Sequence, residues 1–151
     1  MEAKDAGRLD LALADTLLID AAPRRRRVCH LVWVAAPNFD ARERDPLPLV
    51  LFRHPCEWRV RTVQALDQSG RRWRTAFESG SLTAIQAAVR AGVGVATLLP
   101  GNVEFGMTIL DPAVTHLPSP PDVELALYRR PGLRGDAITD VLEGLLWKAV
   151  G

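Results

Sequence analysis

The 151-residue sequence predicts an α/β fold built from two small lobes. Three observations favour this class. Short apolar runs alternate with amphipathic helical segments, a strand, a helix and a second strand follow one another within residues 73–100, and polar connectors at 20–27 and 40–48 interrupt the apolar runs. Because a helix between two such strands implies a parallel crossover connection, the sequence predicts open, parallel-stranded sheets covered by helices.

The segment 73–100 carries the most specific pattern. Residues 74–77 are β-prone, residues 78–81 interrupt the strand, and a helix is expected from Ser81 to Ala91 with Ser81 near its N-cap. A buried strand is then expected over 93–99, closed by Pro100. Within the helix the apolar positions recur at helical spacing, and Gln86 and Arg90 are expected to face water; the apolar positions are Leu82, Ile85, Ala88 and Val89.

The other elements follow from the same periodicities. Further strands are expected at 9–14, 28–36, 49–52, 107–110 and 123–128, and a further helix at 57–68. A terminal helix is expected after Asp136, which is a plausible cap, with one apolar face formed by Ile138, Val141, Leu142, Leu145 and Leu146. These elements suggest a first lobe from residues 1–36 and 118–151, and a second lobe from residues 37–117 that includes the hinge crossings.

Composition favours a soluble, cytoplasmic globular domain. Hydrophobic residues make up 48% of the chain and the formal net charge is +1, which argues against a surface dominated by nucleic-acid binding. No apolar run approaches the roughly 18 residues of a membrane span, and the first residues lack the apolar stretch of a secretory signal. Four consecutive arginines at 24–27 are the only charge run, and they are interpreted as a solvated turn rather than a phosphate-binding patch.

Several segments together resemble the effector-binding domain of LysR-type bacterial transcriptional regulators. They are Gly7 to Leu13, Leu31 to Ala35, Leu47 to Leu51, Cys56 to Arg59 with Ala65 to Gly70, the unit at 73–100, and Leu117 to Arg130. This resemblance implies two Rossmann-like lobes joined by a two-strand hinge, similar to type II periplasmic binding proteins, with the first lobe incomplete. The winged helix-turn-helix of such regulators is not recognisable here, so DNA contact is expected only through a domain absent from this chain.

The resemblance also implies a function, namely binding of a small-molecule inducer between the lobes and transcriptional control through hinge motion and oligomerisation. The inducer is expected to be an organic acid or an aromatic metabolite, with no cofactor, metal or membrane involved. A homo-oligomer or pairing with a full-length regulator is expected, because the incomplete first lobe should leave an exposed sheet edge and an apolar patch. The matching ligand-binding residues are Phe52, Arg53, His54, Ser79, Gly80, Ser81, Leu99 and Pro100.

Each of these residues also has a purely structural interpretation. The two serines cap a helix in any such fold, and Arg53 or Arg59 is either a carboxylate clamp or a solvated side chain. Trp33 and Trp58 are more typical of packing than of an aromatic pocket wall.

Two other classes of protein remain open. A free solute-binding protein would share the architecture. A small enzyme would use His54 and Cys56, but no acidic residue is visibly placed to orient the imidazole. A zinc site made from Cys29, His30, His54 and Cys56 lacks the usual ligand spacing. The sequence therefore favours a sensor that is not an enzyme.

Overall fold

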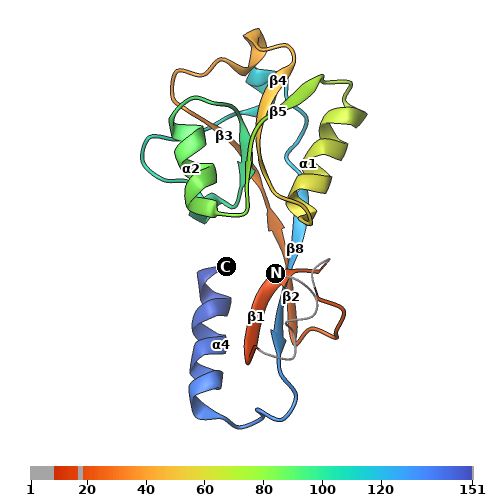
Figure 1. The fold of residues 1–151 in the computed structure, drawn as a ribbon, viewed down its shortest axis with the longest axis vertical. Coiled ribbons are helices and arrows are strands. Elements are labelled where there is room, and N and C mark those ends of the chain that lie inside the picture. Colours follow the sequence, from red (N-terminus) through yellow and green to blue (C-terminus); the bar gives the residue numbers. More distant parts are fainter. Residues whose placement is uncertain (1–8, 17–18, 151) are drawn as a thin grey trace. The chain divides into compact units, whose positions relative to one another are not determined.

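The computed structural model describes residues 9–16 and 19–150, and the chain divides into two compact units (Figure 1). Unit 1 consists of Met1–Cys29 together with Glu124–Gly151, and unit 2 is the continuous segment His30–Val123. The chain therefore passes between the units twice, once near the end of strand β2 and once near the start of strand β8. The predicted segment Gly7 to Leu13 begins outside the described residues.

The elements have the following bounds. The strands are β1 Leu11–Asp15, β2 Arg25–His30, β3 Val32–Ala35, β4 Leu47–Phe52, β5 Trp73–Ser79, β6 Ala96–Leu98, β7 Thr108–Ile109 and β8 Asp122–Arg129. The helices are α1 Glu57–Gln68, α2 Leu82–Arg90, α3 Pro112–Thr115 and α4 Ala137–Ala149, with short 3-10 helices η2 Ala41–Glu43 and η3 Pro100–Asn102. In the described part of the chain, no helix is both long and apolar enough to cross a membrane.

Unit 2 is built on two strand ladders that meet at one point. Strands β4 and β5 are parallel, while β3 lies between β6 and β7 and is antiparallel to both. A parallel bridge between Leu49 and Val95 joins the ladders, and the Val95 N–H donates to the Pro48 carbonyl at 2.9 Å. The parallel β5, α2, β6 arrangement expected from the sequence is thus present, with β4 between the two strands.

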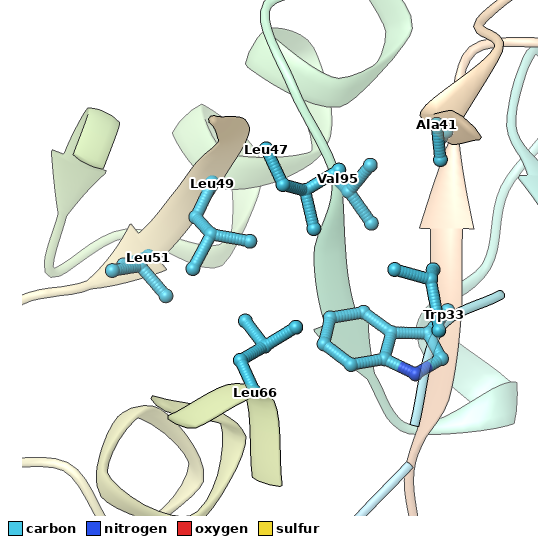
Figure 2. Close-up of a cluster of buried hydrophobic side chains, with 9 residues drawn as sticks. Trp33, Ala41, Leu47, Leu49, Leu51, Leu66 and Val95 are labelled. Atoms are coloured by element: carbon cyan, nitrogen blue, oxygen red, sulfur yellow. The ribbon is translucent and has the colours of Figure 1, made fainter. Parts of the chain in front are cut away.

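The two faces of the unit 2 sheet are covered by different helices. Strand β4 alternates, so that Leu47, Leu49 and Leu51 pack on one side with Leu66 of α1, and Val50 packs on the other. Figure 2 shows the first cluster, in which the wholly buried Trp33 lies against these leucines and Val95. The second cluster contains Ile85, Ala88 and Val89 of α2. This layering confirms the apolar face predicted for α2, and it shows that Trp33 is a core residue.

Gly94 allows β4 and the start of β6 to approach closely. A Cβ atom at this position would lie 2.5 Å from the Pro48 carbonyl oxygen, which is closer than any side chain tolerates. The glycine is therefore required by the backbone contact that joins the two ladders.

Unit 1 has a three-stranded sheet in the order β1, β8, β2, with α4 packed beside β1. Asp136 caps α4 as predicted, since its Oδ1 accepts hydrogen bonds from the N–H and the hydroxyl of Thr139 at 2.8 and 2.7 Å. These bonds lower the pKa of the Asp136 carboxyl. Tyr128 packs in the unit 1 core, and its burial raises the pKa of its phenol.

The structure corrects three expectations. The arginine run is not a solvated turn, because Arg25–Arg27 lie in β2 and contact α4 and β8. The expected strand at 28–36 is two strands, and β3 pairs within unit 2. Gln86 is buried, since its Nε2 donates to the Asn102 carbonyl at 2.9 Å. The predicted terminal helix is present as α4, and the apolar face predicted for it is largely exposed.

Candidate functional site

The ligand-binding residues predicted from sequence gather at one edge of the unit 2 sheet. Strands β4 and β5 are parallel with Phe52 opposite Ser79, and β6 runs parallel to β4 through the bridge near Val95. Because parallel strands end at the same edge, the residues that follow them come together there. We call this set the carboxyl-edge surface; its residues are Phe52, Arg53, His54, Ser79, Gly80, Ser81, Leu99 and Pro100.

Backbone and hydroxyl hydrogen bonds fix the turn between β5 and α2. The Arg53 N–H donates to the Ser79 carbonyl at 3.0 Å, which extends the β4–β5 pairing past the end of β4. The Ser79 hydroxyl oxygen accepts from the Ser81 N–H at 3.1 Å, and the Ser81 hydroxyl oxygen accepts from the Ala84 N–H at 3.4 Å. Both serines therefore stabilise the start of α2, where the helix dipole and first-turn N–H groups favour an anion.

Arg59 and Glu78 form an ion pair that the sequence did not reveal. Arg59 Nη1 donates to the Glu78 carboxylate at 2.7 Å and to the Phe52 carbonyl at 3.0 Å. The hydrogen bond from Arg59 lowers the pKa of Glu78, with smaller contributions from the charges of Arg53 and His54. Arg59 thus ties α1 to the ends of β4 and β5, and it is not a free clamp for an anion. One indication of this ion pair was present in the sequence, namely that Arg59 and Glu78 both lie near the predicted edge of the same sheet.

The carboxyl-edge surface also has an aromatic and a cationic part. Phe52 and Trp58 meet edge to face, with ring centroids 5.5 Å apart and planes at 88°. Arg53 and His54 are exposed beside them, and Leu99 precedes Pro100 at the start of η3. Within the described residues the Arg53 guanidinium makes no ion pair, so its charge is available to a ligand.

Cys29, His30, His54 and Cys56 were the residues considered for enzyme or metal chemistry. Cys56 occupies the N-cap position of α1, directly after the segment that carries His54. Cys29 is buried, and burial raises the pKa of its thiol, which opposes nucleophilic reactivity at neutral pH. Among residues 9–16 and 19–150, no cluster of three or more His, Cys, Asp or Glu side chains is arranged to hold a metal ion.

Two cavities lie away from the carboxyl-edge surface. One of ≈ 430 Å³ in unit 2 is lined by Pro46, Asp67 and residues 70–73. These residues precede β4 and begin β5, so this cavity lies at the opposite end of the strands. The other, of ≈ 260 Å³, lies in unit 1 and is lined by Ile19, Tyr128 and their neighbours. Neither cavity includes a residue expected to bind the effector.

Comparisons with known proteins point to one family. The model of the LysR substrate binding domain matches residues 1–146. The HTH-type transcriptional regulator DgdR of Burkholderia cepacia is 33% identical over 92 residues, covering 60% of this chain and 31% of DgdR. PecT of Dickeya dadantii (strain 3937), another HTH-type transcriptional regulator, is 23% identical over 125 residues, covering 83% of this chain and 39% of PecT. The chain therefore spans between 31% and 39% of the length of these relatives.

Solved structures share the fold. The bromide-bound regulatory domain of HypT from Salmonella typhimurium matches with a TM-score of 0.66 at 16% identity, covering 98% of this chain and 78% of that one. The regulatory domain of CcmR from Synechocystis PCC6803, in complex with 2-PG, matches with a TM-score of 0.59 at 16% identity, covering 93% and 73%. The α/β class predicted from sequence is confirmed, and it is the fold of these regulatory domains.

Proposed function

Because the chain belongs to the family of LysR substrate-binding domains, we propose that it senses a small-molecule effector through the carboxyl-edge surface of unit 2. The observation that carries this proposal is the convergence, at one sheet edge, of three strand ends, the start of α2 and Arg53, whose guanidinium makes no ion pair with the described residues. Such edges of open α/β sheets are where small ligands commonly bind.

The chemistry of the surface favours a carboxylate with an aromatic or other flat apolar body. Arg53 and the start of α2 attract negative charge, while Glu78 is already neutralised by Arg59. The Phe52 and Trp58 rings offer an apolar contact beside that charge. The bromide ion bound to the HypT regulatory domain is consistent with anion binding in this fold.

We further propose that effector binding in the intact regulator controls transcription. DgdR and PecT are HTH-type transcriptional regulators, and this chain, which matches the model of the substrate-binding domain, covers 31% and 39% of their lengths. In this scheme the chain changes its conformational population on binding, and a helix-turn-helix outside the matched region delivers the response to DNA.

A thermal-unfolding series tests effector binding directly. The thermal midpoint of the chain is measured in the presence of benzoate. Benzamide is the control ligand without a charge, and acetate is the control ligand without a ring. Ligand at about a hundred times its Kd stabilises the folded state by about 2.7 kcal/mol, which moves the midpoint by several degrees. We expect benzoate to raise the thermal midpoint more than benzamide or acetate does.

Two variants connect the shift to the surface. Arg53→Gln removes the positive charge of Arg53, and we expect it to abolish the benzoate shift. Arg74→Gln removes another exposed arginine, which lies in β5, and we expect the shift to persist. If no member of a wider acid panel raises the midpoint, or if Arg53→Gln responds as the unmodified chain does, the carboxyl-edge surface is not the binding site.

A further inference from the structure

The two faces of the unit 1 sheet carry side chains of different size. Strands β1 and β8 pair antiparallel, with Leu13 opposite Leu127, and side chains alternate across each strand. One face therefore carries Leu11, Leu13, Leu125 and Leu127, whereas the other, which we call the alanine face, carries Ala12, Ala14, Ala126 and Tyr128. Arg129 shares the face of the leucines and bonds to Glu143, so α4 covers the leucines and not the alanine face.

The cavity of ≈ 260 Å³ in unit 1 lies against the alanine face. Its floor is buried, since Ala12 and Tyr128 are both 8% exposed and Ile19 is 6% exposed. Its rim consists of exposed residues, which are Ala21, Ala22, Arg130 and Pro131. Ile19 packs in the same buried cluster as the alanines, so segment 19–22 forms one wall of the cavity. The cavity thus has a buried apolar floor and an opening to solvent.

Small side chains on the alanine face create this cavity. Larger side chains in the same strands pack closely, since Leu125 and Leu127 are 7% and 0% exposed on the other face. Protein interiors contain few voids larger than one water molecule, so a cavity of this size is unusual in so small a unit. Apolar walls offer a buried water too few hydrogen bonds, whereas an apolar cavity of about 150 Å³ binds benzene. The unit 1 cavity therefore has the size and the lining for a small apolar guest.

We propose that the unit 1 cavity is a second ligand site, which takes a small uncharged apolar molecule about the size of a substituted benzene. The Tyr128 ring on its floor offers an aromatic contact. The two charged residues of the lining are already engaged. Arg130 Nη2 lies 2.8 Å from Asp10 Oδ1, and the Arg129 guanidinium bonds to carboxylates of α4. The site therefore differs in chemistry from the carboxyl-edge surface, which favours an anion, and the proposal does not rest on effector binding there.

A guest in this cavity would hold the two segments of unit 1 together. Ala12 belongs to the first segment and Tyr128 to the second, and the whole of unit 2 lies between them in the sequence. A ligand that binds only the folded state stabilises that state in proportion to its occupancy. The stabilisation should therefore appear in the strands of unit 1.

Fluorine NMR with fluorobenzene tests the proposal. Titration with the 151-residue chain should broaden and shift the fluorine resonance, and fluorobenzene should slow hydrogen exchange in β1 and β8 but not in unit 2. Ala12→Leu fills the floor and should abolish binding. Ala87→Leu is the matched control, since Ala87 is exposed on α2 in unit 2, and it should bind as the unmodified chain does. If circular dichroism shows that Ala12→Leu is unfolded, Ala22→Trp at the exposed rim should block the opening without changing the floor.

Fluorobenzoate and Arg53→Gln separate this site from the carboxyl-edge surface. The Arg53→Gln variant should still bind fluorobenzene, and it should bind fluorobenzoate much more weakly. If Arg53→Gln abolishes fluorobenzene binding while Ala12→Leu and Ala22→Trp leave it intact, the guest lies at the carboxyl-edge surface and the proposed site is wrong. Equal binding of fluorobenzene and fluorobenzoate by Arg53→Gln would overturn the proposed ligand class. Absence of any change in the fluorine resonance up to the solubility limit of fluorobenzene would overturn the site itself.

Discussion

Replacing Glu143 by Gln should destabilise unit 1, because this carboxylate anchors α4. Glu143 is 3% exposed, and its oxygens lie 2.8 Å from Arg24 Nε, 3.3 Å from Arg25 Nε and 3.3 Å from Arg129 Nη1. Glutamine keeps the size of the side chain and one acceptor oxygen, so the substitution removes mainly the negative charge. The three guanidinium groups then lie close together without the negative charge that they share in the unmodified chain.

The size of the effect follows from the exposure of the three arginines. Removing one partner of a buried ion pair costs about 3–5 kcal/mol. The side chains of Arg24 and Arg25 are 45% and 47% exposed, so water recovers part of this loss. The Arg129 side chain is only 5% exposed, but it retains bonds to Asp140 and to the Leu133 carbonyl. We therefore expect a loss just below this range, about 2–3 kcal/mol, against a total stability of about 5–15 kcal/mol for a typical protein.

Urea unfolding measures the change, and hydrogen exchange localises it to unit 1. The matched control is Glu124→Gln in the same unit, where the Arg26 partner is more exposed and lies at 3.2 Å. Exposed pairs contribute at most about 1 kcal/mol, so the control should change little. If Glu143→Gln and Glu124→Gln unfold at the same urea concentration, the buried carboxylate does not anchor α4 and the reasoning is refuted.

Three further substitutions test other contacts. Gly94→Ala places a methyl group 2.5 Å from the Pro48 oxygen and should cost at least about 1–3 kcal/mol by urea unfolding, whereas Gly101→Ala, with open space around it, should be nearly neutral. Thr62→Val removes one of two buried hydroxyl groups that lie 2.6 Å apart, and it should lower the free energy of unfolding by about 1–3 kcal/mol. Adding Thr97→Val should restore part of this loss, because no hydroxyl is then left without its partner. If the double variant regains no stability, the lost hydrogen bond is not the cause. Arg59→Gln should raise the pKa of Glu78 toward its ordinary value in a carboxyl NMR titration. A carboxyl whose pKa is lowered in the folded state stabilises the protein above its unfolded pKa, and this stability is lost as the pH falls through the folded pKa. The Arg59→Gln variant should therefore lose less stability on acidification. If stability falls with acidification as much as in the unmodified chain, Arg59 is not the cause of the lowered pKa.

Locally determined features were predictable from the sequence. Helix α1 spans Glu57–Gln68 as expected, and Ser81 and Asp136 are N-caps, because capping depends on residues within one turn. The carboxyl-edge surface was also predictable, since parallel strands must end at one edge. Its part in effector binding stays a prediction.

Features that depend on distant residues were not predictable. The arginines at 24–27 read as a solvated turn because their partners lie far along the chain; Arg24 and its partner Glu143 are 119 residues apart. The sequence predicted the apolar face of α4 but not whether it is covered, because buried Glu143 and Thr139 decide which side of the helix faces the sheet. Periodicity locates an apolar face but does not say whether the chain itself covers it.

The division of the chain has a consequence for the order of folding. Unit 2 is one uninterrupted segment, His30–Val123, so all of its strands and helices are present once that segment has been synthesised. Unit 1 is built from two segments that are separated by unit 2, since β1 and β2 both pair with β8. During synthesis, which proceeds from the N-terminus, β1 and β2 must therefore remain without their neighbour until β8 emerges. We expect a late, slow step in which unit 1 forms upon an already folded unit 2, because contacts between distant residues carry the larger entropic cost of loop closure.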